Sequence, residues 1–327
     1  MTAFNVKVTG LGAYNPPHVV ENTELVGMVD TSDEWIQTRT GICRRHVSVG
    51  ETVLDMAEAA AAQAIQSSGM KPQDIGLVIV ATSSPDKFFP MTATLLRGRL
   101  GMGEGPGFDL SAGCTGFLYA LSAASSMMQA MDIEHALVVG SEMLTRIVDW
   151  TDRATCVLFG DGAGAFVLSR GEPALEAVYL NARSDDAGML GLNALPVRNP
   201  WVQEQPEFDQ TFHMGGQDVF RFAVEAVPDA VKAVAERSGH TLEDVDWVVP
   251  HQANQRIIHA AMKALGIPAE KWYINVADHG NTGAASIPIA LAEMRERGLL
   301  KAGQRLALVA FGAGFAWGGA WLTWAMD

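Results

Sequence analysis

Short apolar runs alternate along this chain with longer stretches in which apolar residues recur at helical spacing. The runs LVIVA, ALVV and LALVAF are typical of buried strands, because they are short, branched and bounded by polar or glycine-rich segments. Residues Thr52–Ser67 and Phe220–Ser238 are expected to be helices. Strands that alternate with helices predict an α/β protein with mostly parallel sheets.

The same order of elements occurs twice. QDIGLVIVATSS, around Asp74, resembles EDVDWVVPHQAN, around Asp244, and the two aspartates lie 170 positions apart. Cys114 in GCTG matches Asn281 in GNTG, 167 positions later, and each is followed by an apolar stretch of small residues. Two offsets that agree this closely indicate a duplicated plan.

The repeat predicts two related halves, residues 1–172 and 173–327. Their sheets would stack within one compact unit, and the helices after Cys114 and Asn281 would be buried between them. Residues Asn181–Gly216 have no clear periodicity and are interpreted as an insertion or cap.

One apolar segment has two interpretations. Leu306–Met326 contains no charged residue and is long enough to span a bilayer. Its four glycines, Gly312, Gly314, Gly318 and Gly319, would weaken a helix, so two buried strands around a glycine turn are favoured.

Composition narrows the class of protein. The chain has 327 residues, of which 48% are hydrophobic and 18% charged, as in globular proteins. A net charge of −14 disfavours a non-specific nucleic-acid binder. Three widely spaced cysteines give no support for a disulfide framework or a zinc site, and MTAFNVKVTG does not have the pattern of a signal peptide. A reduced, cytoplasmic protein is therefore expected.

Cys114 is the candidate nucleophile. It follows a short strand-like segment and precedes a nearly all-apolar helix, which places its thiol at a helix N-terminus. The macrodipole there favours a thiolate, so a pKa below the free value of about 8.5 is expected. Cys43 and Cys156 lack this setting and are interpreted as inert thiols.

An imidazole and an amide are the candidate partners of this thiol. His251 follows the apolar run WVVP, at the carboxyl end of an expected strand, where α/β proteins collect their active groups. Asn281 occupies the place of Cys114 in the second copy, so related packing would bring both helix starts together. His279 is a rival two residues away, but it lies outside the repeated motif.

The glycine-rich segments have different expected roles. Gly160–Gly164, GDGAG, resembles a dinucleotide loop, but AFVLS after it is typical of a strand, and the dinucleotide fingerprint requires a helix there. NAD binding is therefore rejected. Phe311–Gly314, FGAG, could supply a backbone N–H group to an oxyanion.

Six segments together carry a family resemblance. DTSDEWIQTRTGI, AGCTGF, GDGAGA, PHQANQRI, HGNTGAAS and FGAGFAWG occur in this order over nearly the whole chain. They resemble β-ketoacyl-acyl-carrier-protein synthase III, the condensing enzyme that initiates type II fatty-acid synthesis. The resemblance implies a thiolase-like five-layer αβαβα fold and a homodimer.

The resemblance also implies roles for individual residues. Cys114 would be acylated, His251 and Asn281 would complete a Cys-His-Asn set, and the N–H groups of Cys114 and Ala313 would form the oxyanion hole. Matching positions give three further groups: coenzyme A contacts at Trp35, Arg39, Arg153, Gln217, Phe220 and Arg256; an acyl pocket of Phe89 (from the other subunit), Leu144, Phe159 and Phe311; and a carrier-protein patch of Arg221, Arg256 and Lys263.

Three positions depart from the commoner family pattern. Gln217 stands where Asn is frequent, Gly283 where Ser is frequent, and Ala313 where Gly is frequent. The first two changes alter a tunnel residue and a loop, whereas the third leaves the backbone N–H in place.

The implied reaction needs acyl-CoA and malonyl-acyl-carrier-protein as substrates, and no metal or organic cofactor. Three alternatives remain: a papain-like thiol hydrolase, a relative that acylates a secondary-metabolite precursor from acyl-CoA, and a non-catalytic partner subunit. Cys114 lies far from the N-terminus and outside a CGSCW-like context, which disfavours the hydrolase. The His251 and Asn281 pair favours condensation over the second alternative, and the presence of Cys114 disfavours the third.

Overall fold

The computed structural model describes residues 4–185, 188–203 and 208–326. Within them, eight strands form one mixed sheet in the order β10-β11-β12-β7-β6-β4-β5, with β1 paired to β7. These strands are β1 (Phe4–Tyr14), β4 (Leu77–Ala81), β5 (Gly107–Leu110), β6 (His135–Met143), β7 (Asp161–Ala182), β10 (Trp247–Pro250), β11 (Arg305–Gly312) and β12 (Ala316–Thr323). Four shorter strands form two small ribbons: β2 (Val19–Glu21) with β3 (Arg44–His46), and β8 (Leu190–Gly191) with β9 (His213–Met214).

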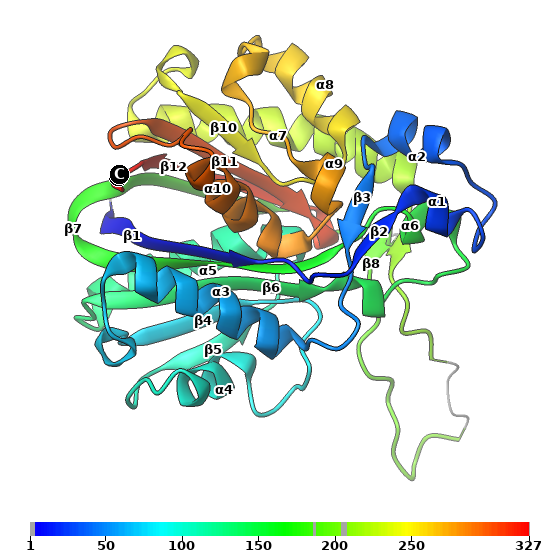
Figure 1. Ribbon diagram of the computed structural model, residues 1–327, viewed down its shortest axis with the longest axis horizontal. Helices are drawn as coiled ribbons and strands as arrows, with labels where there is room; N and C mark the ends of the chain where they lie inside the picture. Colours follow the sequence, from blue (N-terminus) through cyan, green and yellow to red (C-terminus); the bar gives the residue numbers. More distant parts are fainter. Residues whose placement is uncertain (1–3, 186–187, 204–207, 327) are drawn as a thin grey trace.

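Helices lie above, between and below two levels of this sheet (Figure 1). The packing of the apolar cores gives the order of the layers: α7 with α8, strands β10–β12, α5 with α10, strands β4–β6, and α3 with α4. This is the expected five-layer αβαβα architecture. The α-helices are α1 (Asn22–Leu25), α2 (Asp33–Thr40), α3 (Val53–Ser68), α4 (Thr92–Arg99), α5 (Gly116–Ala130), α6 (Arg153–Cys156), α7 (Gly216–Ser238), α8 (Gln255–Leu265), α9 (Val276–His279) and α10 (Ser286–Glu296).

The long strand β7 connects the two levels. Its first part, from Asp161 to Ser169, pairs with β6, and its last part, from Leu175 to Ala182, pairs with β12. β7 therefore crosses the position between residues 172 and 173, so the two proposed halves share one strand; the division there stays a prediction.

The expectation of mostly parallel sheets is wrong. β4 is parallel to β5 and β6, and β10 is parallel to β11, but β7 is antiparallel to β1, β6 and β12, and β11 is antiparallel to β12. A parallel neighbour needs a crossover connection, usually a helix. Only three residues separate β11 from β12, so the chain must return in the opposite direction.

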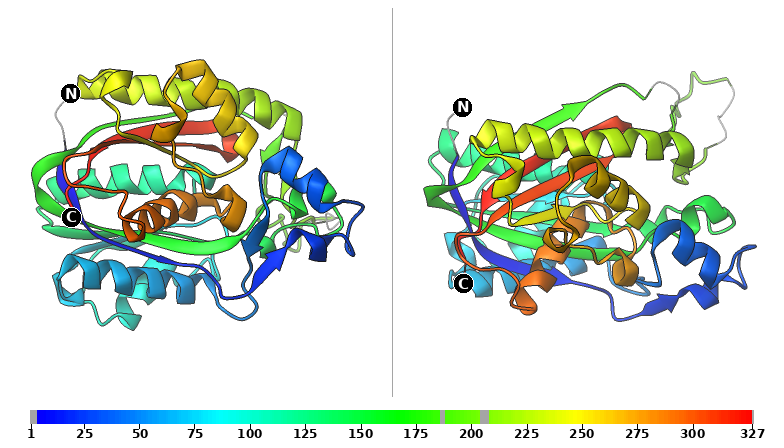
Figure 2. Two further views of the ribbon diagram at one scale, coloured as in Figure 1. Left: turned by 45° about the horizontal axis from the view of Figure 1, so that its top comes forward. Right: turned by 90° about the horizontal axis from the view of Figure 1, so that it is seen from above.

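Three apolar cores separate the layers. The central core packs α5 and α10 between the two levels of the sheet and includes Phe117, Phe166 and Leu291. One outer core lies under α7 and α8, and the other lies under α3 and α4. The helices that follow Cys114 and Asn281 are therefore buried between the two levels, as the repeat predicts (Figure 2).

The uncharged segment Leu306–Met326 forms most of β11 and β12, as expected. Among the described residues, none of the helices has the length and apolarity needed to cross a bilayer. The GDGAG segment also leads into a strand, but the strand already begins at Asp161.

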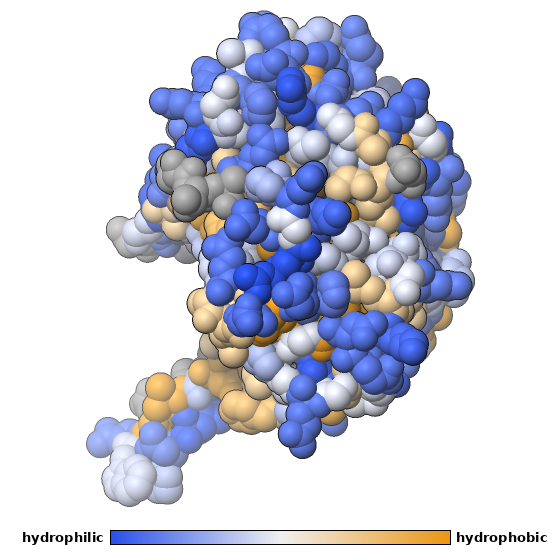
Figure 3. Space-filling model, turned by 90° about the vertical axis from the view of Figure 1, so that its left-hand side faces the viewer, coloured by the Kyte–Doolittle hydropathy of each residue, from blue (hydrophilic) through white to orange (hydrophobic). Residues whose placement is uncertain are grey.

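Residues around β8 and β9 form the expected insertion. The described residues between these two short strands, 192–203 and 208–212, extend away from the layered body in Figure 1. Hydrophilic residues cover most of the face on the side of the C-terminus, and apolar atoms are scattered over it, as on most globular proteins (Figure 3).

Candidate active site

The loops at the carboxyl ends of the two sheet levels meet around one cavity of about 770 Å³. Its walls include the three candidate catalytic residues, Cys114, His251 and Asn281, although 137 positions separate the first two in the sequence. A cavity of this size is typical of a small-molecule site. The other expected site residues on its walls are Trp35, Arg39, Phe159, Gln217, Phe220, Arg221, Arg256 and Phe311.

Cys114 lies in a short 3-10 turn, Gly113–Thr115, directly before α5. Burial, and secondarily the carboxyl group of Glu142, raise the pKa of its thiol to about 12, although the backbone N–H of Cys114 acts in the opposite direction. The expectation of a lowered pKa is therefore wrong. In the free protein, loss of hydration outweighs the effect of the helix N-terminus.

His251 follows β10 and is 2% exposed. Its Nδ1 atom lies 2.6 Å from the hydroxyl oxygen of Ser286, the first residue of α10, and the Phe311 ring packs against it with centroids 5.7 Å apart. A hydroxyl group both donates and accepts, so Ser286 can pair with either neutral tautomer of His251. Burial lowers the pKa of His251 to about 3, which keeps the ring neutral near pH 7.

This low pKa predicts that His251 stays neutral from pH 5 to pH 8. An imidazole whose pKa is depressed gains its proton only as the pH falls toward that value. The ring ¹⁵N signals of His251, assigned by comparison with His251→Asn, should therefore keep constant shifts over this range. A midpoint between pH 6 and pH 7 would contradict the burial effect.

Asn281 is held on both sides by backbone contacts. Its N–H donates to the carbonyl of Leu158 at 2.8 Å, and its own carbonyl accepts from Gly160 N at 3.0 Å. The side-chain oxygen accepts from Gly283 N at 2.9 Å. Because the oxygen is already engaged, the amide NH₂ group is the part of Asn281 that can act as a donor in the cavity.

The rival His279 is engaged elsewhere. Its Nε2 atom pairs with Glu293 at 3.3 Å, and its ring stacks on His46. It lines a different pocket from the one that holds Cys114.

The segments that carry Cys114 and Ala313 touch each other. Gly113 has a φ of +53°, and a Cβ atom built there would lie 3.1 Å from Ala313 N. A Cβ atom built on Gly312 would lie 2.8 Å from Cys114 N. Glycine at both positions allows the two segments to approach this closely. Ala313 itself does not line the cavity, and the oxyanion hole made by the N–H groups of Cys114 and Ala313 stays a prediction.

Five of the six expected coenzyme A residues, all except Arg153, line the cavity. Trp35 lines it, and the guanidinium carbon of Arg153 lies 4.8 Å from the centroid of the Trp35 ring. Arg256 is stacked on Phe220 at 5.5 Å. Arg153 itself is not on the cavity wall, so it reaches the site through Trp35.

The expected acyl-pocket residues divide into two groups. Phe159 and Phe311 line the cavity, and the buried Leu144 packs in the same apolar cluster as Phe159. Phe89 is 87% exposed and does not line this cavity.

The residues of the expected basic patch lie on the two neighbouring helices α7 and α8. Arg221 on α7 and Arg256 on α8 line the cavity, and Lys263 lies seven residues, or about two turns, after Arg256 on the same face of α8. Arg221 also pairs with Asp218 at 3.3 Å.

Two buried residues near the site were not identified from the sequence. Ser286, which holds His251, follows the GNTGAA segment directly, so the motif itself could have indicated it. Glu142 lies at the end of the run HALVVGSE, which is otherwise typical of a buried strand. A carboxylate is rarely buried without a partner, so this position could have indicated a polar site.

Comparison with known proteins agrees with this geometry. Two family models match: 3-oxoacyl-[acyl-carrier-protein] synthase III over residues 108–185, and the C-terminal part of the same family over residues 235–324. The chain is 44% identical to the beta-ketoacyl-[acyl-carrier-protein] synthase III of Clostridium novyi, with 98% of this chain and 99% of the relative covered.

Two solved structures are similar over nearly the whole chain. The 3-oxoacyl-[acyl-carrier-protein] synthase III of Aquifex aeolicus gives a TM-score of 0.91 at 40% identity and covers 98% of this chain and 100% of that one. The priming β-ketosynthase of the R1128 polyketide pathway gives a TM-score of 0.91 at 35% identity and covers 98% and 96%. The chain therefore belongs to the β-ketoacyl-acyl-carrier-protein synthase III family.

Proposed function

We propose that this chain is an acyltransferase that moves a short acyl group from acyl-CoA to Cys114 and then condenses it with malonyl-acyl-carrier-protein, which initiates type II fatty-acid synthesis. The observation that carries the proposal is the convergence of Cys114, His251 and Asn281 on one cavity. The names of full-length relatives support the same reaction.

The first half-reaction transfers the acyl group. The sulfur of Cys114 attacks the thioester carbonyl of acyl-CoA, and the N–H groups of Cys114 and Ala313 stabilise the oxyanion that forms. The C–S bond to CoA then breaks, and the proton of the Cys114 thiol ends on the CoA thiol. In the tautomer in which His251 Nδ1–H donates to Ser286, the free Nε2 atom can take this proton and pass it to the leaving CoA sulfur.

The second half-reaction forms a carbon–carbon bond. Malonyl-acyl-carrier-protein loses CO₂, and the electron pair becomes an enolate whose oxygen needs hydrogen-bond donors. The amide NH₂ of Asn281 and the Nε2–H of neutral His251 supply them. The enolate carbon attacks the acyl carbonyl on Cys114, the C–S bond breaks, and the Cys114 sulfur takes up one proton.

The outer cavity suits coenzyme A. The Trp35 and Arg153 pair offers a flat, cationic surface for the adenine end, and Gln217 with Phe220 would line the pantetheine path. Arg39 and Arg256 add positive charge to a protein whose net charge is −14, which would attract the phosphates of coenzyme A and the acidic carrier protein.

This charge arrangement predicts a salt-dependent KM. Raising the ionic strength from about 50 mM to about 500 mM should increase KM for acetyl-CoA by about threefold to tenfold, because salt screens charges at the cavity mouth. Arg256→Ala should raise KM at low salt and reduce the salt effect. A KM that stays constant over this range in the wild-type protein would contradict the proposed attraction between these arginines and coenzyme A.

A homodimer would explain the exposure of two neighbouring aromatic residues, Phe88 and Phe89. Phe88 and Phe89 are 63% and 87% exposed, and Phe88 lines a groove with Leu110, at the end of edge strand β5, and with Leu195 of the insertion. An open strand edge beside exposed apolar residues is a ready surface for a second copy. Phe89 would then enter the acyl pocket of the partner. The free state of all three cysteines supports the proposed cytoplasmic location.

The acceptor distinguishes the two candidate roles. Purified protein loaded with acetyl-CoA should release CO₂ and form a β-ketoacyl product with malonyl-acyl-carrier-protein, read by mass spectrometry of the carrier protein. The structural similarity to a polyketide priming enzyme keeps the acylation of a specialised precursor as the alternative. Acyl-enzyme formation without condensation on malonyl-acyl-carrier-protein would favour that alternative, and no acyl-enzyme with any short or medium acyl-CoA would refute both.

A further inference from the structure

Glu142 is a buried carboxyl group that the mechanism above does not use. It lies near the end of β6, is 0% exposed, and contributes to the raised pKa of Cys114. A buried carboxyl without a cation beside it is costly, so its retention next to a nucleophile needs an explanation.

Its hydrogen-bond partners all come from two loops of the site. Ser83 N donates to both carboxyl oxygens at 3.1 and 3.0 Å, and the hydroxyls of Ser84 and Thr82 lie 2.7 and 3.4 Å from one of them. The backbone N–H of Ala284, three residues after Asn281, is a further donor. Glu142 therefore connects β6 to the loop after β4 and to the loop that carries Asn281.

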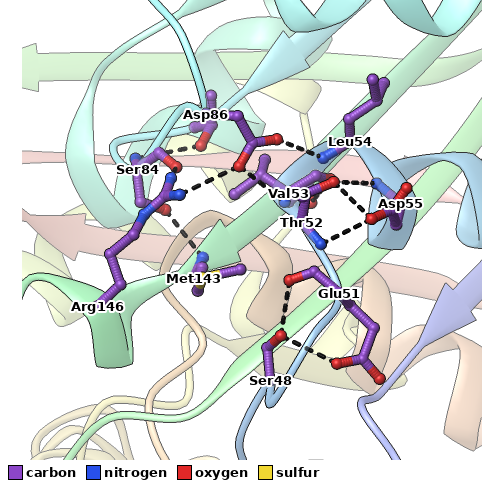
Figure 4. Close-up of polar contacts among 12 residues, drawn as sticks. Ser48, Glu51, Thr52, Val53, Leu54, Asp55, Ser84, Asp86, Met143 and Arg146 are labelled. Carbon is purple, nitrogen blue, oxygen red and sulfur yellow. Dashed lines mark hydrogen bonds and ion pairs between the residues drawn. The ribbon is translucent and has the colours of Figure 1, made fainter.

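The loop after β4 is fixed on its other side as well (Figure 4). Ser84 accepts a hydrogen bond from Met143 N at 2.9 Å, and Arg146 donates to the Ser84 carbonyl and to Asp86. Asp86 in turn accepts from the N–H groups of Val53 and Leu54 at the start of α3. Because these contacts hold the loop in place, it cannot move away from the buried carboxyl of Glu142.

Glycine at position 283 leaves space for Glu142 in the neighbouring loop. A Cβ atom at Gly283 would lie 3.1 Å from the Cγ atom of Glu142 and 3.1 Å from Leu144, and φ there is +55°. Gly283 N is also the group that holds the side-chain oxygen of Asn281. The carboxyl therefore packs directly behind the Asn281 loop.

Both charge states of Glu142 can be accommodated. One oxygen faces the hydroxyls of Ser84 and Thr82, which can accept a hydrogen bond from the protonated carboxyl as well as donate one to the carboxylate. The backbone N–H groups donate to the ionised form. Burial raises the pKa of Glu142 to about 7, and these hydrogen bonds act in the opposite direction.

The other charged groups around Glu142 are compensated. Arg146 and Asp86, beyond Ser84, pair with each other at 3.1 Å. Asp161, on the neighbouring strand β7, accepts from Thr145 and Ser48. Among the groups that affect the pKa of Cys114, Glu142 is the charged side chain.

We propose that Glu142 is a positioning residue whose charge state sets how readily Cys114 becomes the nucleophile. With its proton, the neutral carboxyl holds the two loops in place and leaves the thiol free to ionise. Without its proton, the carboxylate opposes the negative charge on the Cys114 sulfur. The inference rests on the proposed role of Cys114, but it concerns the thiol itself and does not depend on the acyl donor.

The test measures the reactivity of the Cys114 thiol without any substrate. Cys114 is labelled with methyl methanethiosulfonate, a small uncharged thiol reagent, between pH 5.5 and pH 9, and its rate is followed by mass spectrometry of the Cys114 peptide. At pH 8.5, Glu142→Gln should react about three to ten times faster than wild type, which corresponds to a thiol pKa lower by about half to one unit. At pH 5.5, where wild-type Glu142 holds its proton, the two rates should agree within about twofold.

Two further variants keep this test decisive. Ser84→Ala removes a donor that favours the ionised carboxyl, so Glu142 should stay neutral to a higher pH and labelling should be about twice as fast as wild type near pH 7.5. Glu134→Gln, which removes an exposed charge just before β6, should behave as wild type.

A purely structural role would give a different result. The ratio of Glu142→Gln to wild-type rates would then be independent of pH, and Ser84→Ala would match wild type, which would overturn the proposal. If Glu142→Gln does not fold, as judged by circular dichroism, the labelling rate of Ser84→Ala near pH 7.5 decides: about twice the wild-type rate supports the proposal, and the wild-type rate overturns it. Acylation by acetyl-CoA is measured separately, so loss of the proposed function would be recognised independently.

Discussion

Replacement of Cys114 with alanine is expected to lower kcat for condensation by at least about 10⁴-fold, because no other group on the cavity wall can form the thioester intermediate. The fold should survive, since the thiol is free, is only partly buried and lies on the cavity wall. The rate at which the β-ketoacyl product forms on the carrier protein in the presence of acetyl-CoA, followed by mass spectrometry, measures this loss.

Cys43→Ala is the matched control, because it removes a thiol that lies outside the cavity. It should retain wild-type activity within about twofold, as expected for a substitution away from the site. Comparable losses in both variants would mean that the assay reports general damage, and substantial condensation by Cys114→Ala would exclude Cys114 as the nucleophile.

The second large effect concerns the backbone beside the thiol. Gly312→Ala would place a Cβ atom 2.8 Å from Cys114 N and 3.0 Å from Cys114 Cβ, so one of the two segments must move. That movement displaces an oxyanion-hole donor, and loss of one such donor costs about 10² to 10³ in rate. We therefore expect acylation of Cys114 by acetyl-CoA, followed by rapid-quench mass spectrometry, to slow by this factor.

Gly98→Ala provides the comparison, because Gly98 lies in α4 and a Cβ atom there meets nothing within 4 Å. This variant should acylate at the wild-type rate. Normal acylation by Gly312→Ala would show that the contact between residues 312 and 114 does not shape the site.

Much of the fold was predictable from local pattern. The runs that became β4, β6, β10 and β11 are short, apolar and bounded by polar residues. The helices after Cys114 and Asn281 are largely apolar because two sheet levels cover them. The internal repeat then indicated which elements of the first half correspond to which elements of the second. Strand direction was not predictable in the same way, because the paths of β7 and β12 depend on where the chain turns back.

The site residues that lie in a sequence motif were predictable, whereas the properties that depend on burial were not. Cys114, His251 and Asn281 each follow the end of an element in a recognisable segment, so their convergence could be expected. The pKa of Cys114 could not, because sequence spacing indicates a helix start but not how much water reaches the sulfur. The contacts of Glu142 could not be predicted, because its partners Ser83 and Ser84 lie 59 and 58 positions earlier in the sequence.

The central claim is that Cys114 receives the acyl group, and peptide mapping after incubation with acetyl-CoA tests it most directly. The account predicts one acetyl group per chain on the peptide that contains Cys114, with CoA released in equal amount. An acetyl group on the Cys43 or Cys156 peptide instead, or CoA release with no covalent adduct, would contradict it.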